Sequence, residues 1–279
     1  MHSNVQPMPR RGQSGQAAVE TALVVPMMVF LVLGTLQLGM VHHARLMTEY
    51  AAYRAARSGV VNHGDCGLMK KAALVALLPT LGPYGNQAGR VDTLDNAWLV
   101  HDAYSEAVLG NVPGLPPPPF YPNSILPLMR VEIVNPRRGQ LANLFSTYGS
   151  HMQQREIDWD DIRDATVINA NLLTVRVTYF YEMRIPFANW QLHSFYMGRE
   201  YLNGLRGVQF ENKRMGGQSA TAYLEAMGAA RDADHAQIAN VARNGRRYVI
   251  PLVTTWSMRM QSNLLNNSSY GPGRCAVDA

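Results

Sequence analysis

Hydrophobic residues are concentrated in one early run of the chain. Residues 17–41 read AAVETALVVPMMVFLVLGTLQLGMV, and residues 23–41 contain no charged side chain. Such a run of 19 uncharged, mostly apolar residues can cross a bilayer as a helix. It exceeds the usual apolar region of a signal peptide, and no small-residue cleavage site with a polar mature start follows it. The pattern therefore predicts a retained membrane helix.

The helical pattern continues beyond the apolar run. Leu46, Tyr50 and Tyr53 follow one another at spacings of four and three residues, as on one face of a helix. Gly59 is the predicted stop. The sequence thus predicts a helix over residues 17–58, about 60 Å long at 1.5 Å per residue, with one half inside the membrane and one half outside it.

Three later segments have the composition of β-strands. They cover residues 128–134, 172–185 and 249–260 and are rich in β-branched and aromatic residues. The strands lie far apart in the chain with few predicted helices between the first two, so we expect a mostly antiparallel sheet. Packing this sheet on the outer half of the long helix gives an α+β fold.

Helices are predicted around these strands. Apolar spacing indicates one helix over 68–78, which ends before Pro79, and a second over 93–109. A Pro-rich stretch over 110–127 predicts an extended connector. An Ala-rich stretch over 216–242 predicts a helical insertion before the last strand.

The composition narrows the class of protein. Hydrophobic residues make up 47% of the chain and charged residues 16%. This composition excludes a disordered or low-complexity protein. The net charge is +5, but the basic pairs Arg137-Arg138, Lys213-Arg214 and Arg246-Arg247 are scattered and lack interleaved aromatic residues. We therefore expect no nucleic-acid partner.

Sequence motifs for catalysis are absent. The chain contains no Gly-rich phosphate loop and no His-Glu-x-x-His, Gly-x-Ser-x-Gly or Cys-x-x-Cys motif. One acidic segment contains Asp158, Asp160, Asp161 and Asp164. It could coordinate a hard cation such as calcium, but it lacks the glycine and distal glutamate of an EF-hand loop. We interpret it as a solvated acidic turn or helix start and expect no metal, no cofactor and no enzymatic activity.

Glu20 is the acidic residue at the start of the apolar run. A carboxylate deep in a bilayer costs about 3 kcal/mol. Glu20 therefore either reaches the interface near Arg10 and Arg11 or is neutralised by a positive group of a partner in an assembly of such helices. Basic residues flank both ends of the run, and we favour a cytoplasmic N-terminus because a large domain after a single first helix usually crosses the membrane.

The N-terminal stretch resembles a known family. Residues 10–60 read RRGQSGQAAVETALVVPMMVFLVLGTLQLGMVHHARLMTEYAAYRAARSGV. This stretch is similar to the N-terminus of TadE/TadG-like proteins, the minor pseudopilins of tight-adherence (Flp-type) pili, a branch of the type IV pilus machinery. Three later segments are similar to strands of these proteins: ILPLMRVEIVNP (125–136), NANLLTVRVTYFYEMRIPFANWQL (169–192) and YVIPLVTTWSMRMQSN (248–263).

The resemblance implies how the N-terminus is processed. In that family a short basic leader ends in glycine, a prepilin peptidase cuts after it, and the fifth mature residue is glutamate. Gly15 matches the leader glycine, Gln16 would become the new N-terminus, and Glu20 is the fifth mature residue. Thr21 stands where the family often has an aromatic residue.

The resemblance also implies a pilin-like organisation and a structural function. Residues 1–15 would form a cytoplasmic leader, 16–60 a transmembrane and extended helix, and 61–279 an extracytoplasmic α+β domain. The protein would act in assembly of a tight-adherence pilus by membrane anchoring and helix–helix packing. Its expected partners are the prepilin peptidase, other pilin and pseudopilin subunits, the pilus assembly platform and the inner membrane.

Two other functions stay open at this point. One is an uncleaved, membrane-anchored periplasmic scaffold of the pilus or secretion machinery. The other is a membrane-anchored periplasmic enzyme. In each case we expect one crossing of the inner membrane, with the N-terminus in the cytoplasm and the C-terminal domain in the periplasm. A processed subunit would in addition enter an extracellular pilus.

The two cysteines are too few for a disulfide-rich scaffold and lack the spacing of a zinc site. In an oxidising periplasm Cys66 and Cys275 could pair. A loop of that length would contribute up to roughly 5 kcal/mol to stability. The alternative is two unpaired thiols.

Overall fold

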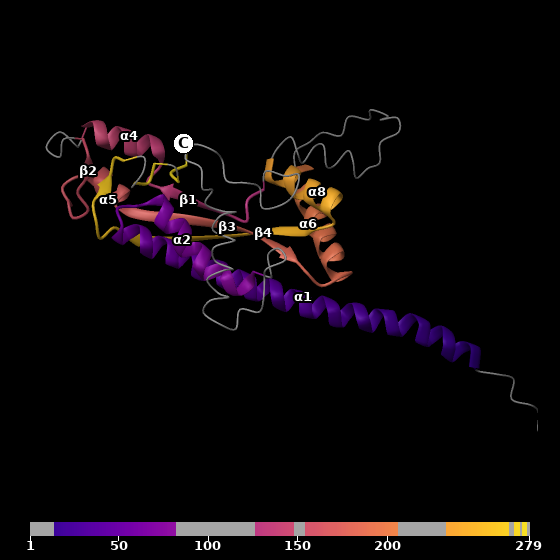
Figure 1. Ribbon diagram of the computed structural model, residues 1–279. Coiled ribbons are helices and arrows are strands. Elements are labelled where there is room, and N and C mark those ends of the chain that lie inside the picture. The colour runs from indigo at the N-terminus through magenta and orange to yellow at the C-terminus, as the bar shows by residue number, and fades with distance from the viewer. Residues whose placement is uncertain are drawn as a thin grey trace, which may run out of the picture.

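The computed structural model describes residues 14–81, 126–147, 154–205, 233–267, 271–273 and 275–277. A long N-terminal helix lies along an antiparallel sheet, and shorter helices pack around the two (Figure 1). This arrangement confirms the predicted α+β class.

The first helix, α1 (Ser14–Val61), has 48 residues and changes its surroundings along its length. Residues 18–32 are all exposed, whereas Ala44, Ala51 and Ala52 are completely buried. The predicted long helix is therefore confirmed, and it has an exposed N-terminal half and a packed C-terminal half.

The main sheet has three strands. They are β1 (Met129–Asn135), β3 (Leu172–Met183) and β4 (Tyr248–Arg259), in the order β1-β3-β4. Both pairings are antiparallel, and Val177 of the central strand lies opposite Val131 on one side and Thr254 on the other. The three predicted strands are confirmed, with ends that differ by at most two residues.

One face of the central strand β3 is buried from Leu173 to Met183, and the other face is buried at Thr178 and Phe180. Leu173 lies close to Gly59 of α1, so the alternate residues Val175 and Tyr179 also face the long helix. Phe180 points to the opposite face and is completely buried there as well. The core thus extends from α1 through the sheet to the far side.

Smaller elements complete the described structure. They are α2 (Cys66–Leu77), η1 (Leu78–Thr80), α4 (Arg138–Thr147), β2 (Glu156–Ile157), α5 (Ala165–Ala170), α6 (Ala188–Leu205), α8 (Ala233–Gly245) and β5 (Leu264–Leu265). α2 confirms the helix predicted over 68–78. The predicted helix over 93–109 lies outside the described residues, as does most of the connector over 110–127. Of the predicted insertion over 216–242, the described part belongs to α8. The sequence did not predict α4 or α6, and of α5 it indicated only a turn or helix start at the acidic segment.

Polar contacts fix α8 and α6 to the sheet. Arg130 of β1 donates two hydrogen bonds of 2.8 Å to the Asp234 carboxylate of α8. On α6, Nδ1 of the buried His193 lies 3.1 Å from the Val249 carbonyl oxygen of β4. Only a protonated Nδ1 can donate to a carbonyl, so this contact sets the tautomer. Burial lowers the pKa of His193, because desolvation disfavours the charged ring.

The sequence predicted that the first helix ends at Gly59, and this prediction is wrong. Gly59 lies inside α1. The helix continues to Val61, and the chain turns after it at Gly64, where φ is +74°. A Cβ atom on Gly59 would lie 2.6 Å from Sδ of Met69 and 2.7 Å from Cδ2 of Leu173. Glycine is therefore required here for close packing of α1 against α2 and β3.

We expect Gly59→Val to lower the free energy of unfolding by about 1–3 kcal/mol, because extra methyl groups have no room in this part of the core. The measurement is urea unfolding of the full chain in mild detergent, followed by tryptophan fluorescence. The control is Gly198→Val on α6, where no atom lies within 4 Å of the added Cβ. Valine has the higher helix propensity, so this variant should be no less stable than the wild type. Equal losses at the two positions would contradict the packing argument.

Candidate functional site

The N-terminal half of α1 presents a continuous apolar surface. Leu23, Met27 and Leu31 follow one another at one-turn spacing and are 70%, 71% and 62% exposed. A surface of this kind marks a contact with a membrane or another protein. Among the described residues, α1 contains the one helix that is long and apolar enough to cross a membrane. The predicted apolar helix is thus present with the required length.

The three residues that the sequence associates with processing lie at the start of this helix. Gly15 and Gln16 belong to its first turn. Glu20 lies five residues after Gly15, which is about 7.5 Å along the helix axis at 1.5 Å per residue. Glu20 is exposed. None of the other described residues forms an ion pair with it. Within the described part of the chain, the carboxylate is thus an unpaired charge on the apolar half of α1.

The apolar half meets the folded domain at a junction in the middle of α1. The ring of Phe30 lies edge-on to the ring of Phe187, with centroids 6.2 Å apart. Two turns further on, Oε1 of Gln37 accepts a 2.9 Å hydrogen bond from the backbone amide of Ile185. Gln37 is completely buried. The connection between β3 and α6 is therefore held against α1 by one aromatic contact and one polar contact.

An apolar cleft of about 380 Å³ opens along the same part of α1. α1 contributes five residues between Thr35 and His43, and Thr80 and Tyr181 close the other side. Burial raises the pKa of Tyr181 above its ordinary value, and the positive charge of Arg184 lowers this pKa by a smaller amount. Among the described residues, the lining contains His43 and Tyr181 as titratable side chains and no carboxylate.

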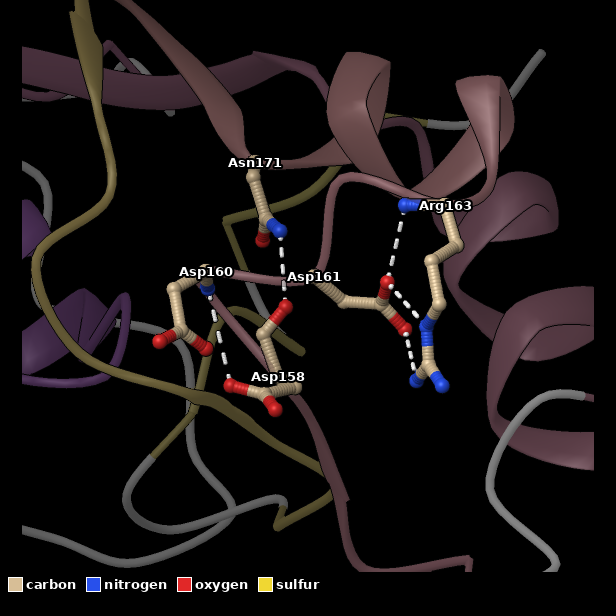
Figure 2. A network of polar contacts seen from close by, with 5 residues as sticks. All are labelled: Asp158, Asp160, Asp161, Arg163 and Asn171. Carbon is tan, nitrogen blue, oxygen red and sulfur yellow. Dashed lines mark hydrogen bonds and ion pairs between the residues drawn. The ribbon is translucent and has the colours of Figure 1, made fainter.

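The acidic segment between β2 and α5 uses its carboxylates in local contacts (Figure 2). The buried Asp161 carboxylate accepts two hydrogen bonds from the Arg163 guanidinium, of 2.8 and 2.9 Å, and a third from the Arg163 amide. The Asp158 carbonyl accepts from the side chain of Asn171 at 2.8 Å. These contacts close the turn between the two elements.

Asp164 caps the short helix α5. Its Oδ1 accepts hydrogen bonds from the amide and the hydroxyl of Thr166, at 2.8 and 2.7 Å, and these bonds lower the pKa of Asp164. Asp160 differs, because its hydrogen bond with Asp158 and the charge of Asp158 raise its pKa. No group of three potential metal ligands is present among the described residues. The segment is an acidic turn followed by a helix start.

The two cysteines are joined. The Sγ atoms of Cys66 and Cys275 lie 1.90 Å apart, with their Cα atoms 5.6 Å apart. Next to the disulfide, the C-terminal segment runs along the outer edge of β1, where the Ile133 amide donates to the Cys275 carbonyl at 2.7 Å and the Val277 amide donates to the Ile133 carbonyl at 3.1 Å. The end of the chain is thereby fixed close to the end of α1.

Comparison with known proteins gives a match for most of α1. Residues 15–57 match the family model described as TadE-like protein. The N-terminal segment is TadE-like. The match includes the apolar half of α1, the junction and part of the packed half, and it confirms the resemblance seen in the sequence. No curated protein and no solved structure gives a significant match to the chain.

Within the TadE-like segment, the sequence interpretation missed Gln37. The residue had a visible signal, because it is an amide side chain inside the uncharged run over 23–41. Its partner is a backbone amide, that of Ile185, and no sequence pattern identifies such a partner. Phe187 was missed for a similar reason, since one aromatic residue in a loop gives no indication of its neighbour on α1.

We expect loss of the disulfide to lower the free energy of unfolding by about 2–5 kcal/mol, because the bond closes a very long loop in the unfolded chain. The measurement is urea unfolding of the full chain with and without reductant. The Cys66→Ser/Cys275→Ser variant serves as the control, and its stability should not respond to reductant. Free alkylation of both thiols in the exported, unreduced protein would contradict the pairing.

Proposed function

We propose that the protein is a minor pseudopilin, a structural component for assembly of a tight-adherence (Flp) type IV pilus. The observation that carries this proposal is the TadE-like match over residues 15–57, which falls on a helix with an exposed apolar half. A helix of this kind suits both a bilayer and a bundle of similar helices, because both surroundings cover apolar side chains.

The mechanism that we propose is assembly by helix packing. α1 holds the subunit in the inner membrane and later packs against the corresponding helices of other subunits. A prepilin peptidase cuts after Gly15, and the new amine of Gln16 on one subunit pairs with Glu20 of its neighbour. Burial of two opposite charges as a pair avoids the cost of burying either one alone.

The proposed orientation places the N-terminus in the cytoplasm and the domain in the periplasm. The disulfide between Cys66 and Cys275 supports this orientation, because disulfides persist in oxidising compartments and are rare in the cytosol. The proposed partners are the prepilin peptidase, other pilin and pseudopilin subunits and the assembly platform of the pilus. The domain would supply the contacts with these subunits.

The first test of this function is the N-terminus of the mature protein in its native cell. We expect the chain to begin at Gln16, and to begin at Met1 in a strain without the prepilin peptidase. Mass spectrometry of the N-terminal peptide gives the answer in both strains. An intact Met1 in both strains would contradict the proposal of a processed pseudopilin. It would favour an uncleaved, permanently anchored scaffold.

The second test concerns the charge pair. We expect Glu20→Ala to leave membrane insertion intact and to weaken each subunit contact by roughly 3 kcal/mol or more, because the partner amine is left buried without a counter-charge. Pili sheared from the cells are then quantified against protein in the membrane fraction. The matched control is Glu49→Ala, which removes a half-exposed carboxylate of the same helix beside Arg45. Normal piliation in Glu20→Ala would contradict the charge pair.

A further inference from the structure

Two large aromatic side chains are exposed where the domain meets the apolar half of α1. Phe187 precedes α6 and is 66% exposed, and Trp190 in the first turn of α6 is 59% exposed. We call these two residues the aromatic tip. Figure 1 shows the connection between β3 and α6 beside α1, at the end of the domain from which the free part of the helix emerges. The aromatic tip therefore belongs to the end of the domain that is nearest the apolar helix.

The depth of the aromatic tip follows from its contact with α1. A bilayer core of about 30 Å requires about 20 helical residues, so a span that begins near residue 17 ends near Gln37. Phe187 packs against Phe30, which lies seven residues before Gln37. Seven residues correspond to about 10 Å of helix. A domain held in this position reaches about 10 Å past the level of Gln37, into the leaflet on its own side.

The chemistry of the aromatic tip suits this depth. Tryptophan and other aromatic side chains are enriched at the boundary between head groups and acyl chains. The indole N–H of Trp190 makes no hydrogen bond with any described residue, so it can donate to a lipid carbonyl or phosphate. Arg184 begins the same connection and is exposed. One nitrogen of its guanidinium, Nη2, donates to the Thr80 carbonyl oxygen at 3.3 Å, and the positive charge at this level favours nearby phosphates.

A lipid surface is the occupant that the geometry favours. Phe187 of the aromatic tip is in direct contact with Phe30, and Phe30 belongs to the exposed apolar surface of α1. The two surfaces are therefore continuous, and whatever solvates the helix at Phe30 also reaches Phe187. We propose that Phe187 and Trp190 insert into the membrane leaflet on the domain side. The domain then rests on the bilayer and does not stand clear of it.

This inference rests on the membrane anchor of the proposed function and is independent of the pilus. The test uses the full chain reconstituted in phosphatidylcholine vesicles. Flotation of the vesicles after an alkaline wash first establishes that the chain is anchored. A chain that does not float with the vesicles overturns the anchor, and this proposal with it.

The measurement is quenching of a single tryptophan by lipids with brominated acyl chains. In the variant Trp98→Phe/Trp159→Phe/Trp256→Phe, Trp190 is the one tryptophan left. We expect its fluorescence to fall roughly two-fold or more in brominated vesicles, because an interfacial indole lies at the edge of the acyl chains. The matched control retains Trp159 alone. That residue lies between β2 and α5, at the opposite end of the domain from α6 (Figure 1), and should not respond.

A second measurement leaves the tryptophans unchanged. A benzophenone amino acid in place of Phe187 should form a lipid adduct on irradiation, detected by mass, and the same probe in place of Ile162, which is 70% exposed, should form none. The proposal is overturned if an anchored chain shows no more quenching at Trp190 than at Trp159 and no lipid adduct at position 187. A crosslink from position 187 to a second copy of the chain, with no lipid adduct, also overturns it.

Discussion

The close contact between the small-residue face of α1 and the central strand β3 is the interaction on which the rest of the structure depends. Ala51, Ala52, Ala55 and Ala56 are completely buried, and a Cβ atom on Gly59 would lie within 2.7 Å of the side chains of Met69 and Leu173. Short side chains let the helix axis approach β3, β4 and α2 together. They also lose little side-chain entropy on burial. One helix thus supplies both the exposed apolar segment and a wall of the core.

The junction at Gln37 connects the apolar half of α1 to the folded domain. α1 runs without interruption from the apolar half into the domain, and the bond from Ile185 to Gln37 holds the β3–α6 connection at the point of change. A buried polar group is costly unless it is hydrogen-bonded, so Gln37 favours this one position of the connection. Because no flexible linker intervenes, a tilt or rotation of the helix is transmitted directly to the sheet.

The sequence predicted the elements that carry a local pattern. The apolar run, the helical spacing and the β-rich segments each identify one element, and α1, α2 and the three main strands follow from them. α4 and α5 have 10 and 6 residues and too few turns to show a period. α6 buries the polar His193 and exposes the aromatic Trp190 and Phe195, so its apolar residues do not identify its buried face. The pairing of the cysteines and the Gln37 contact depend on residues far apart in the chain. The proposed cleavage after Gly15 would require a second protein, and the fold of this chain does not encode it.

The disulfide gives the domain an unusual covalent topology. Cys66 follows the end of α1 by five residues, and the bond to Cys275 spans a sequence separation of 209 residues, so nearly the whole domain is a closed ring attached to the helix at one point. A single proteolytic cut inside that ring leaves every residue covalently attached to α1. Release of the whole domain by one cut requires cleavage within the helix itself or within residues 62–65, where Gly64 and Asp65 are buried. After a single cut inside the ring, the domain therefore stays covalently attached to α1.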